Sequence, residues 1–528
     1  MKKFCLPLCC DNFASSKQKN VSHRFSRLEF IYKKHKTESL MKIKNLFAAL
    51  LLMTVALGTN EMTAAVPGAK NGNVNATPLM SKLPKKGKIV KESYNEIMGC
   101  KDLELSNGAH VMLKPTDFEK DEICMSALQR GGSSLYGEED WANCEMFNAA
   151  IPASGLGGLS NKELKKVLDG KNIEIWRSLD TYEDRISGNS TVKDLETLFQ
   201  LVYLHFTDVT KDEATFNELL DAYKTRLKEE EMESDDSDHM FFMNDAFMDT
   251  TTNILYDHNW RYPFKTIKSG DMARVNYDRI LEIAKERTAN AAGYTFVFVG
   301  SFDDATIRPL IEQYIASLPA NKGVKSNWVN VATRPQKDVV CHFTHEMKVP
   351  RTTINIRWFN TKIPYSSENY MKAKLLSDIL KFKIYREKIR EDTGVAFGPV
   401  GGNEQHYTEG DNTFTEVHSF VTVKPEYADE VIRILKDEMH KACEHIDEAA
   451  FNEYKQEQLE YYKSRGKDMD KTNYYWLRVI NEYVLRGTDL NTDDEQIIKG
   501  LTPESISAFA RELLATGHIL EIVMSPAE

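Results

Sequence analysis

The stretch that decides the fold is residues 293–319, Gly-Tyr-Thr-Phe-Val-Phe-Val-Gly-Ser-Phe-Asp-Asp-Ala-Thr-Ile-Arg-Pro-Leu-Ile-Glu-Gln-Tyr-Ile-Ala-Ser-Leu-Pro. Tyr294–Val299 combines β-branched and aromatic residues without a charge, which is typical of a strand buried on both faces. Gly300 ends this strand, and an oxygen-bearing side chain within 303–306 can cap the helix that follows.

The second part of this stretch predicts an amphipathic helix. Its apolar residues recur at helical spacing, at Ile307, Leu310, Ile311, Tyr314 and Leu318. Pro309 is acceptable only near the first turn, where a missing N–H costs little, and Pro319 stops the helix. The polar segment 321–338 then indicates a linker. The chain therefore divides there into two halves of similar size.

Charge is unevenly distributed along the 528 residues. The net charge is −11, yet residues 1–65 hold 11 Lys/Arg against 4 Asp/Glu, which leaves −18 on the remainder. Phosphate-rich partners select basic surfaces, so this acidic body argues against binding to nucleic acid or to an anionic membrane.

The N-terminus is typical of a secretory signal that begins at Met41. A basic start is followed by the apolar run Leu46–Leu57 and by small residues at 63–65. An apolar run of this length is too short to span a membrane comfortably, so a membrane anchor is the weaker alternative. We expect Met41 rather than Met1 to be the true start, export to the periplasm, and a flexible tether over residues 66–95.

Five cysteines follow the signal, namely Cys100, Cys124, Cys144, Cys341 and Cys443. They are far apart and odd in number, so they do not predict a disulfide framework, although one pair could form in an oxidising compartment. Most are expected to pack as small hydrophobic residues.

Strand and helix patterns in the first half predict mixed α/β structure. Leu103–Pro115 predicts a hairpin with a type I′ turn at Asn107-Gly108, and Ile123–Leu128 predicts a further strand. Helices are expected at Trp141–Ala153, 193–206 and 213–227.

An internal repeat sets the domain organisation. Asp212-Glu-Ala-Thr-Phe-Asn-Glu218 recurs as Asp447-Glu-Ala-Ala-Phe-Asn-Glu453, with six of seven residues identical at an offset of 235. A repeat of this length indicates a duplicated domain rather than a solenoid. The sequence predicts an α+β protein with two tandem α/β domains, 96–320 and 339–528, each an antiparallel-rich sheet packed with helices.

These segments resemble the pitrilysin/insulinase family of zinc metallopeptidases, over roughly residues 85–528. The resemblance rests on 105–115, 154–157, 193–197, 296–303, 313–319 and 389–398. The resemblance is to the C-terminal half of long bacterial members. It implies that the α/β domains are paired, and that two such pairs together enclose a peptide substrate.

The zinc motif of that family, His-x-x-Glu-His, is absent from this sequence. The matching helix, just before Ser154, carries Met146-Phe-Asn-Ala149-Ala150 instead. Two other histidine groups do not replace the motif. His440, Glu444 and His445 do not share one helix face, and His342 and His345 point to opposite faces of an expected strand.

The C-terminal half of that family supplies an arginine that grips the substrate and, seven residues later, a tyrosine that stabilises the oxyanion. By resemblance, Arg390 takes the first role, although a solvated helix end explains it equally well. Phe397 stands where the tyrosine is expected and has no hydroxyl, so either Tyr407 supplies a donor or this copy is degenerate.

The sequence thus predicts a secreted subunit that binds no metal itself and holds a peptide or unfolded protein for a zinc-bearing partner in a heterodimer. The alternative is a pseudo-peptidase that acts as a peptide-binding or structural subunit without proteolysis. An independent hydrolase is disfavoured because no Gly-x-Ser-x-Gly motif occurs.

Overall fold

The computed structural model describes residues 79–234, 245–262, 267–321, 327–391, 396–398 and 400–527. The expected signal segment and Met41 lie outside these residues. The part from Ala76 to Glu528 forms one compact unit. None of the helices within the described ranges is long and apolar enough to cross a membrane.

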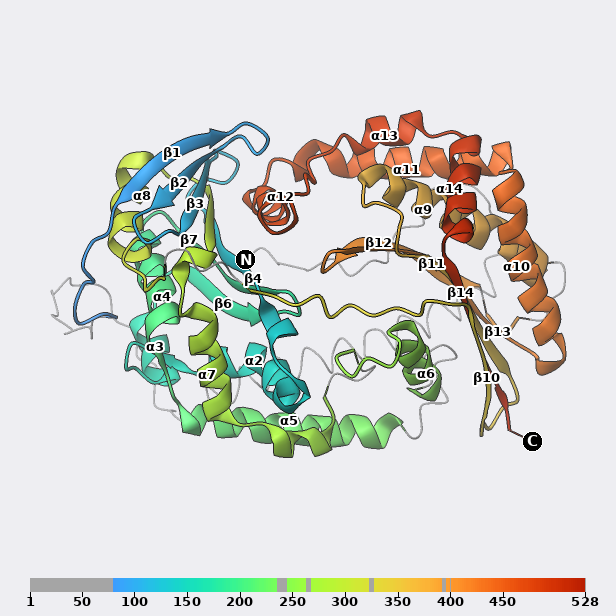
Figure 1. The fold of residues 1–528 in the computed structure, drawn as a ribbon, viewed down its shortest axis with the longest axis horizontal. Helices are drawn as coiled ribbons and strands as arrows, with labels where there is room; N and C mark the ends of the chain where they lie inside the picture. Colours follow the sequence, from blue (N-terminus) through green and yellow to red (C-terminus); the bar gives the residue numbers. More distant parts are fainter. Residues whose placement is uncertain are drawn as a thin grey trace, which may run out of the picture. The chain divides into compact units, whose positions relative to one another are not determined.

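The first half is built around a seven-stranded sheet (Figure 1). Its strands are β1 (Ile89–Asn95), β2 (Cys100–Leu105), β3 (His110–Pro115), β4 (Ile123–Arg130), β6 (Ile173–Leu179), β7 (Glu183–Ser190) and β9 (Thr295–Gly300). Its helices are α2 (Trp141–Ala153), α3 (Asn161–Val167), α4 (Leu195–Thr207), α5 (Glu213–Ser234), α6 (Asp245–Leu255), α7 (Tyr277–Thr288) and α8 (Asp304–Leu310). A short pair, β5 (Gly155–Leu156) and β8 (Val209–Thr210), lies apart from this sheet.

The second half is built around a five-stranded sheet. Its strands are β10 (Val339–His345), β11 (Thr352–Asn360), β12 (Gly401–Glu409), β13 (Asn412–Val423) and β14 (His518–Pro526). Its helices are α9 (Ser367–Asp378), the π-helix η6 (Ile379–Glu391), α10 (Ala428–Glu444), α11 (Glu448–Met469), α12 (Asn473–Arg486), α13 (Asp494–Gly500) and α14 (Pro503–Ala515).

The stretch 293–319 forms the predicted strand and helix. β9 lies in the middle of the first sheet, between β3 and β4, and five of its six residues are buried. A side chain on Gly300 would collide with the carbonyl oxygen of Glu122, and its φ of +144° suits glycine. Asp303 caps α8 by accepting from the N–H of Thr306 at 2.8 Å.

Pro309 departs from the expectation. It is the sixth residue of α8, beyond the first turn, and the helix widens into the π-turn η5 (Ile311–Ile315) two residues later. Proline removes an N–H and crowds the carbonyl four residues earlier, and a widened turn relieves both effects.

The two sheets confirm the duplication. Five strands of the first sheet follow the order β3-β9-β4-β7-β6, and the second sheet has the order β10-β14-β11-β13-β12. The first pair in each order is parallel, and the others are antiparallel. The repeated heptapeptide begins a helix of 22 residues in both halves. In both, the aspartate caps it, since Asp212 accepts from Thr215 N and Asp447 from Ala450 N.

Each sheet has helices of its own half on one face and a helix of the other half on the opposite face. Residues of α12 join a buried apolar cluster with β2, β3, β4 and β9 of the first sheet. Residues of α6 join another with β11, β13 and β14 of the second sheet. Each half thus contributes one helix that packs on the sheet of the other half, α12 on the first sheet and α6 on the second (Figure 1).

Two local expectations are corrected. Ser106–Gly108 link β2 to β3, and only Gly108 has a positive φ there, so the turn is not type I′, which needs two such residues. The segment assigned as a tether ends in strand β1, which pairs with β2 from Ile89 onward.

All five described cysteines are free. Cys100, Cys124 and Cys144 are buried, and Cys341 and Cys443 are partly buried. The expectation that most of them pack as small hydrophobic residues is confirmed.

Candidate functional site

The helix α2 occupies the place of the zinc motif, and its residues there form part of a core. Met146, Phe147 and Ala150 are at most 1% exposed and pack in one cluster with Ile280 and Ile283 of α7. Zinc sites in proteins are built from cysteine, histidine and carboxylate ligands, so these residues do not fit the ion. Over the described ranges, no group of three or more His, Cys, Asp or Glu residues could hold a metal ion.

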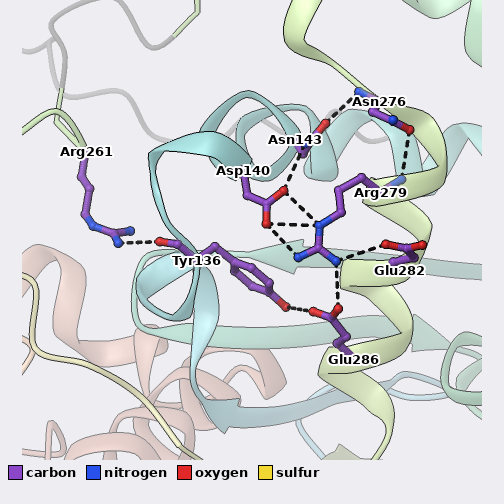
Figure 2. Close-up of polar contacts among 8 residues, drawn as sticks. All are labelled: Tyr136, Asp140, Asn143, Arg261, Asn276, Arg279, Glu282 and Glu286. Carbon is purple, nitrogen blue, oxygen red and sulfur yellow. Dashed lines mark hydrogen bonds and ion pairs between the residues drawn. The ribbon is translucent and has the colours of Figure 1, made fainter.

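A polar network fixes the start of α2 against α7 (Figure 2). The guanidinium of Arg279 donates to both oxygens of Asp140, at 2.7 to 3.1 Å, and to Glu286 at 2.8 Å. Hydrogen bonds from Arg279 hold the pKa of Asp140 below its usual range. The hydroxyl of Tyr136 donates to the other oxygen of Glu286 at 2.9 Å. This face of the first half is therefore rigidly positioned.

The two histidine groups lie as the sequence predicts. His440, Glu444 and His445 are all exposed at the end of α10. Burial alternates along β10, so that His342 is more exposed than its neighbours, and His345 lies on the other face. The imidazole Nε2 of His342 lies 2.7 Å from Glu521. Neither group assembles a catalytic centre.

Two of the residues predicted by resemblance, Phe397 and Tyr407, lie far apart. Arg390 is near the end of η6, and its side chain is outside the part of the chain that the structure describes. Phe397 is 42% exposed, and its N–H donates to the carbonyl of Thr422 on β13. Tyr407 pairs with Phe414, at the opposite end of β13.

This placement corrects one expectation. Thr422 and Phe414 are eight residues apart on one strand, which corresponds to roughly 26 Å. The hydroxyl of Tyr407 accepts from Arg334 at 3.0 Å, and burial raises its pKa. Tyr407 therefore does not supply the hydroxyl that Phe397 lacks.

A buried charged cluster surrounds Tyr407, and it was not predicted from the sequence. The guanidinium of Arg334, from the segment between the halves, lies 4.3 Å from the ring centres of Tyr256 and Phe414 and 2.7 Å from Glu409. Close by on the second sheet, Glu416 is fully buried. The sequence did contain an indication of this cluster, because the charged residue Glu416 interrupts the apolar pattern of a strand.

Glu416 is the centre of the second part of this cluster. Its Oε1 lies 2.8 Å from Arg357 and 2.7 Å from the Nδ1 of His418. Burial alone would raise the pKa of Glu416, but these two partners outweigh it and lower the pKa to about 2. The carboxylate thus remains charged inside the protein.

The sequence is similar to those of known peptidase-family proteins. The profile of the family described as "Peptidase M16 inactive domain" matches residues 274–458. "Zinc protease PQQL-like" of Arabidopsis thaliana is 25% identical over 242 residues, which are 46% of this chain and 22% of that protein. "Probable zinc protease PqqL" of Escherichia coli (strain K12) is 21% identical over 427 residues, which are 78% of this chain and 42% of that protein.

A solved structure shows the same fold. The periplasmic protease PqqL from Escherichia coli superposes with a TM-score of 0.69 at 19% identity, over 91% of this chain and 50% of that one. The chain thus spans half or less of the length of these relatives.

The duplicated α/β fold and the match of residues 274–458 to the M16 inactive domain indicate a peptidase-like domain pair. Residues 274–458 match the M16 inactive domain, and the chain is similar to the C-terminal half of long members of the M16, or pitrilysin/insulinase, family of peptidases.

Proposed function

We propose that this chain is a non-catalytic subunit that holds a peptide or unfolded protein for a zinc-bearing subunit of the same family. The observation that carries the proposal is the inactive-domain match together with the buried Met146, Phe147 and Ala150 of α2, none of which is a zinc ligand. The zinc required for hydrolysis would then belong to the partner.

The proposed contribution to the substrate contact is the segment 389–398. Arg390 would hold a substrate carbonyl through paired hydrogen bonds, which a guanidinium provides and an ammonium does not. Phe397, at the position of the family's tyrosine, can only pack. This loss of a hydroxyl favours the alternative function, a pseudo-peptidase that binds peptide without proteolysis.

The proposed location is the periplasm. The signal pattern at Met41–Ala65 supports it, as does the solved relative PqqL, which is a periplasmic protease.

The proposal predicts that this chain supports peptidase activity only in combination with a zinc-bearing subunit. The purified chain should not cleave a fluorogenic peptide, whereas adding a His-x-x-Glu-His subunit from the same organism should raise that subunit's turnover at least tenfold. Size-exclusion chromatography should show the two subunits eluting together. If they neither elute together nor differ in turnover from the zinc subunit alone, the pseudo-peptidase alternative replaces the proposal.

Within such a pair, Arg390→Lys should lower peptidase turnover by ~10-fold, because a transition-state hydrogen bond is lost while the charge remains. Arg433→Lys is the matched control, since Arg433 is exposed and pairs with Asp437 on its own helix within the described part of the chain. The affinity of the pair is measured separately. Equal turnover in both variants would remove Arg390 from the substrate contact.

A further inference from the structure

A small pocket opens beside α2, and the proposed function does not use it. Its volume is about 30 Å³, room for about two groups the size of a water molecule. Side chains of both polar and aromatic type line it, among them Tyr136, Trp141, Cys144, Glu145, Trp260 and Arg261.

Two groups in this pocket lack partners. Trp141 and Glu145 are one helical turn apart on α2, so they share a face of the helix. The indole Nε1 of Trp141 is buried and has no hydrogen-bond acceptor. No hydrogen bond or ion pair of Glu145 occurs among the residues that the structure describes. The pocket therefore offers an uncompensated acid.

Arg261 and Tyr136, which also line the pocket, already have hydrogen-bond partners. Figure 2 shows Arg261 directed at the carbonyl of Tyr136, at 2.5 Å, and its other terminal nitrogen donates to the carbonyl of Ser133 at 2.9 Å. The guanidinium also stacks on Trp260, 4.3 Å from the ring centre. Tyr136 is held by Glu286. These contacts preform the pocket and leave Arg261 no role as a counter-ion.

Desolvation is the sole cause that raises the pKa of Glu145, to about 7. A neighbouring cation would have lowered it. The carboxyl is thus poised between its neutral and charged forms, and a cation that entered the pocket would stabilise the charged form.

We propose that this pocket binds a primary ammonium group at the end of a slender alkyl chain, as in a lysine side chain of a peptide or partner protein. The ammonium group would donate to Glu145 beside the indole ring of Trp141, and an aromatic ring attracts alkylammonium ions. Divalent calcium needs six or more oxygen ligands, which one carboxylate does not provide. The inference is independent of the pairing proposed above.

The test is calorimetric titration of the full chain at pH 8 with three small probes. N-acetyl-lysine amide carries only the side-chain ammonium, norleucine amide carries only a terminal amine, of which about half is charged at pH 8, and N-acetyl-norleucine amide carries neither. The first should bind saturably and the third at least tenfold more weakly. Binding of norleucine amide instead would assign the same site to a chain terminus. Equal binding of all three probes, or none, overturns the proposal.

Variants and pH make the test specific. Glu145→Gln, which removes only the charge, should weaken N-acetyl-lysine amide at least tenfold, whereas Glu218→Gln on the exposed side of α5 should not. Because a carboxyl with a pKa of about 7 is protonated at lower pH, affinity should fall about tenfold from pH 8 to pH 6. An affinity that is unchanged by pH, or by Glu145→Gln, also overturns it.

Discussion

Replacing Ile480 by aspartate is expected to lower the free energy of unfolding by about 4–5 kcal/mol or more, the largest effect of any change we predict. Ile480 is fully buried on α12 and packs against the first sheet, although it belongs to the second half of the chain. A carboxylate there would lose its hydration without gaining a counter-ion.

Denaturant unfolding measures this effect, with two variants as references. Tyr474→Asp introduces the same charge on the same helix, but Tyr474 is 69% exposed, so its cost should stay below about 0.5 kcal/mol. Ile480→Val keeps the site apolar and should cost about 0.5–1.5 kcal/mol. Similar losses for both aspartate variants would mean that α12 does not pack on the first sheet.

The same measurement bears on how the halves are coupled. Hydrogen bonds accompany the apolar contact between α12 and the first half. Ser126 donates to Asn481 at 2.6 Å, and Thr116 donates to Asn473 at 2.5 Å. Because α6 makes the reciprocal contact with the second sheet, we expect the two halves to unfold in one transition. Two separate transitions in the native protein would contradict this.

The local elements and the duplication were predictable from the sequence because they depend on short patterns. Tyr294–Val299 has no charged residue and became a central strand. Trp141–Ala153 has the predicted bounds of α2. The heptapeptide repeat marks equivalent helices since an aspartate cap and the residues it orders are close in sequence.

Contacts between distant segments were not predictable. The patterns of α6 and α12 show which residues are apolar, but not which sheet they cover. The distance between Phe397 and Tyr407 follows from strand register, which no residue near either one encodes. The pocket beside Trp141 and Glu145 was unpredictable for the same reason, since residues 133–137 and 260–261 also line it.

Some features of the candidate site were likewise predictable from the sequence, and others were not. The missing zinc motif is a property of the sequence itself, and the burial of Met146 and Ala150 agrees with it. The Arg334 cluster needed the fold, because Arg334 contacts Tyr407, 73 residues further along the chain, and Tyr256 of the first half.

Replacing Glu416 by glutamine is expected to cost about 3–5 kcal/mol at pH 7, because Arg357 would keep a charge in a buried position without its partner. The side chains of Glu416 and Arg357 are 0% and 12% exposed, so water screens this pair little. Asp437→Asn is the matched control. It breaks the exposed pair with Arg433, which should cost at most about 0.5 kcal/mol. Denaturant unfolding at pH 7 compares the two.

The pH dependence has a definite sign. The pKa of Glu416 falls from 4.5 to about 2 on folding, so its ionisation contributes about 3 kcal/mol of stability above pH 4.5. This contribution is lost as the pH falls from 4.5 towards 2, since protonation then removes the charge in the folded state as well. The stability difference between the native protein and Glu416→Gln should therefore shrink over that interval. A difference that stays constant from pH 7 to pH 3 would show that the carboxylate charge does not stabilise the second sheet.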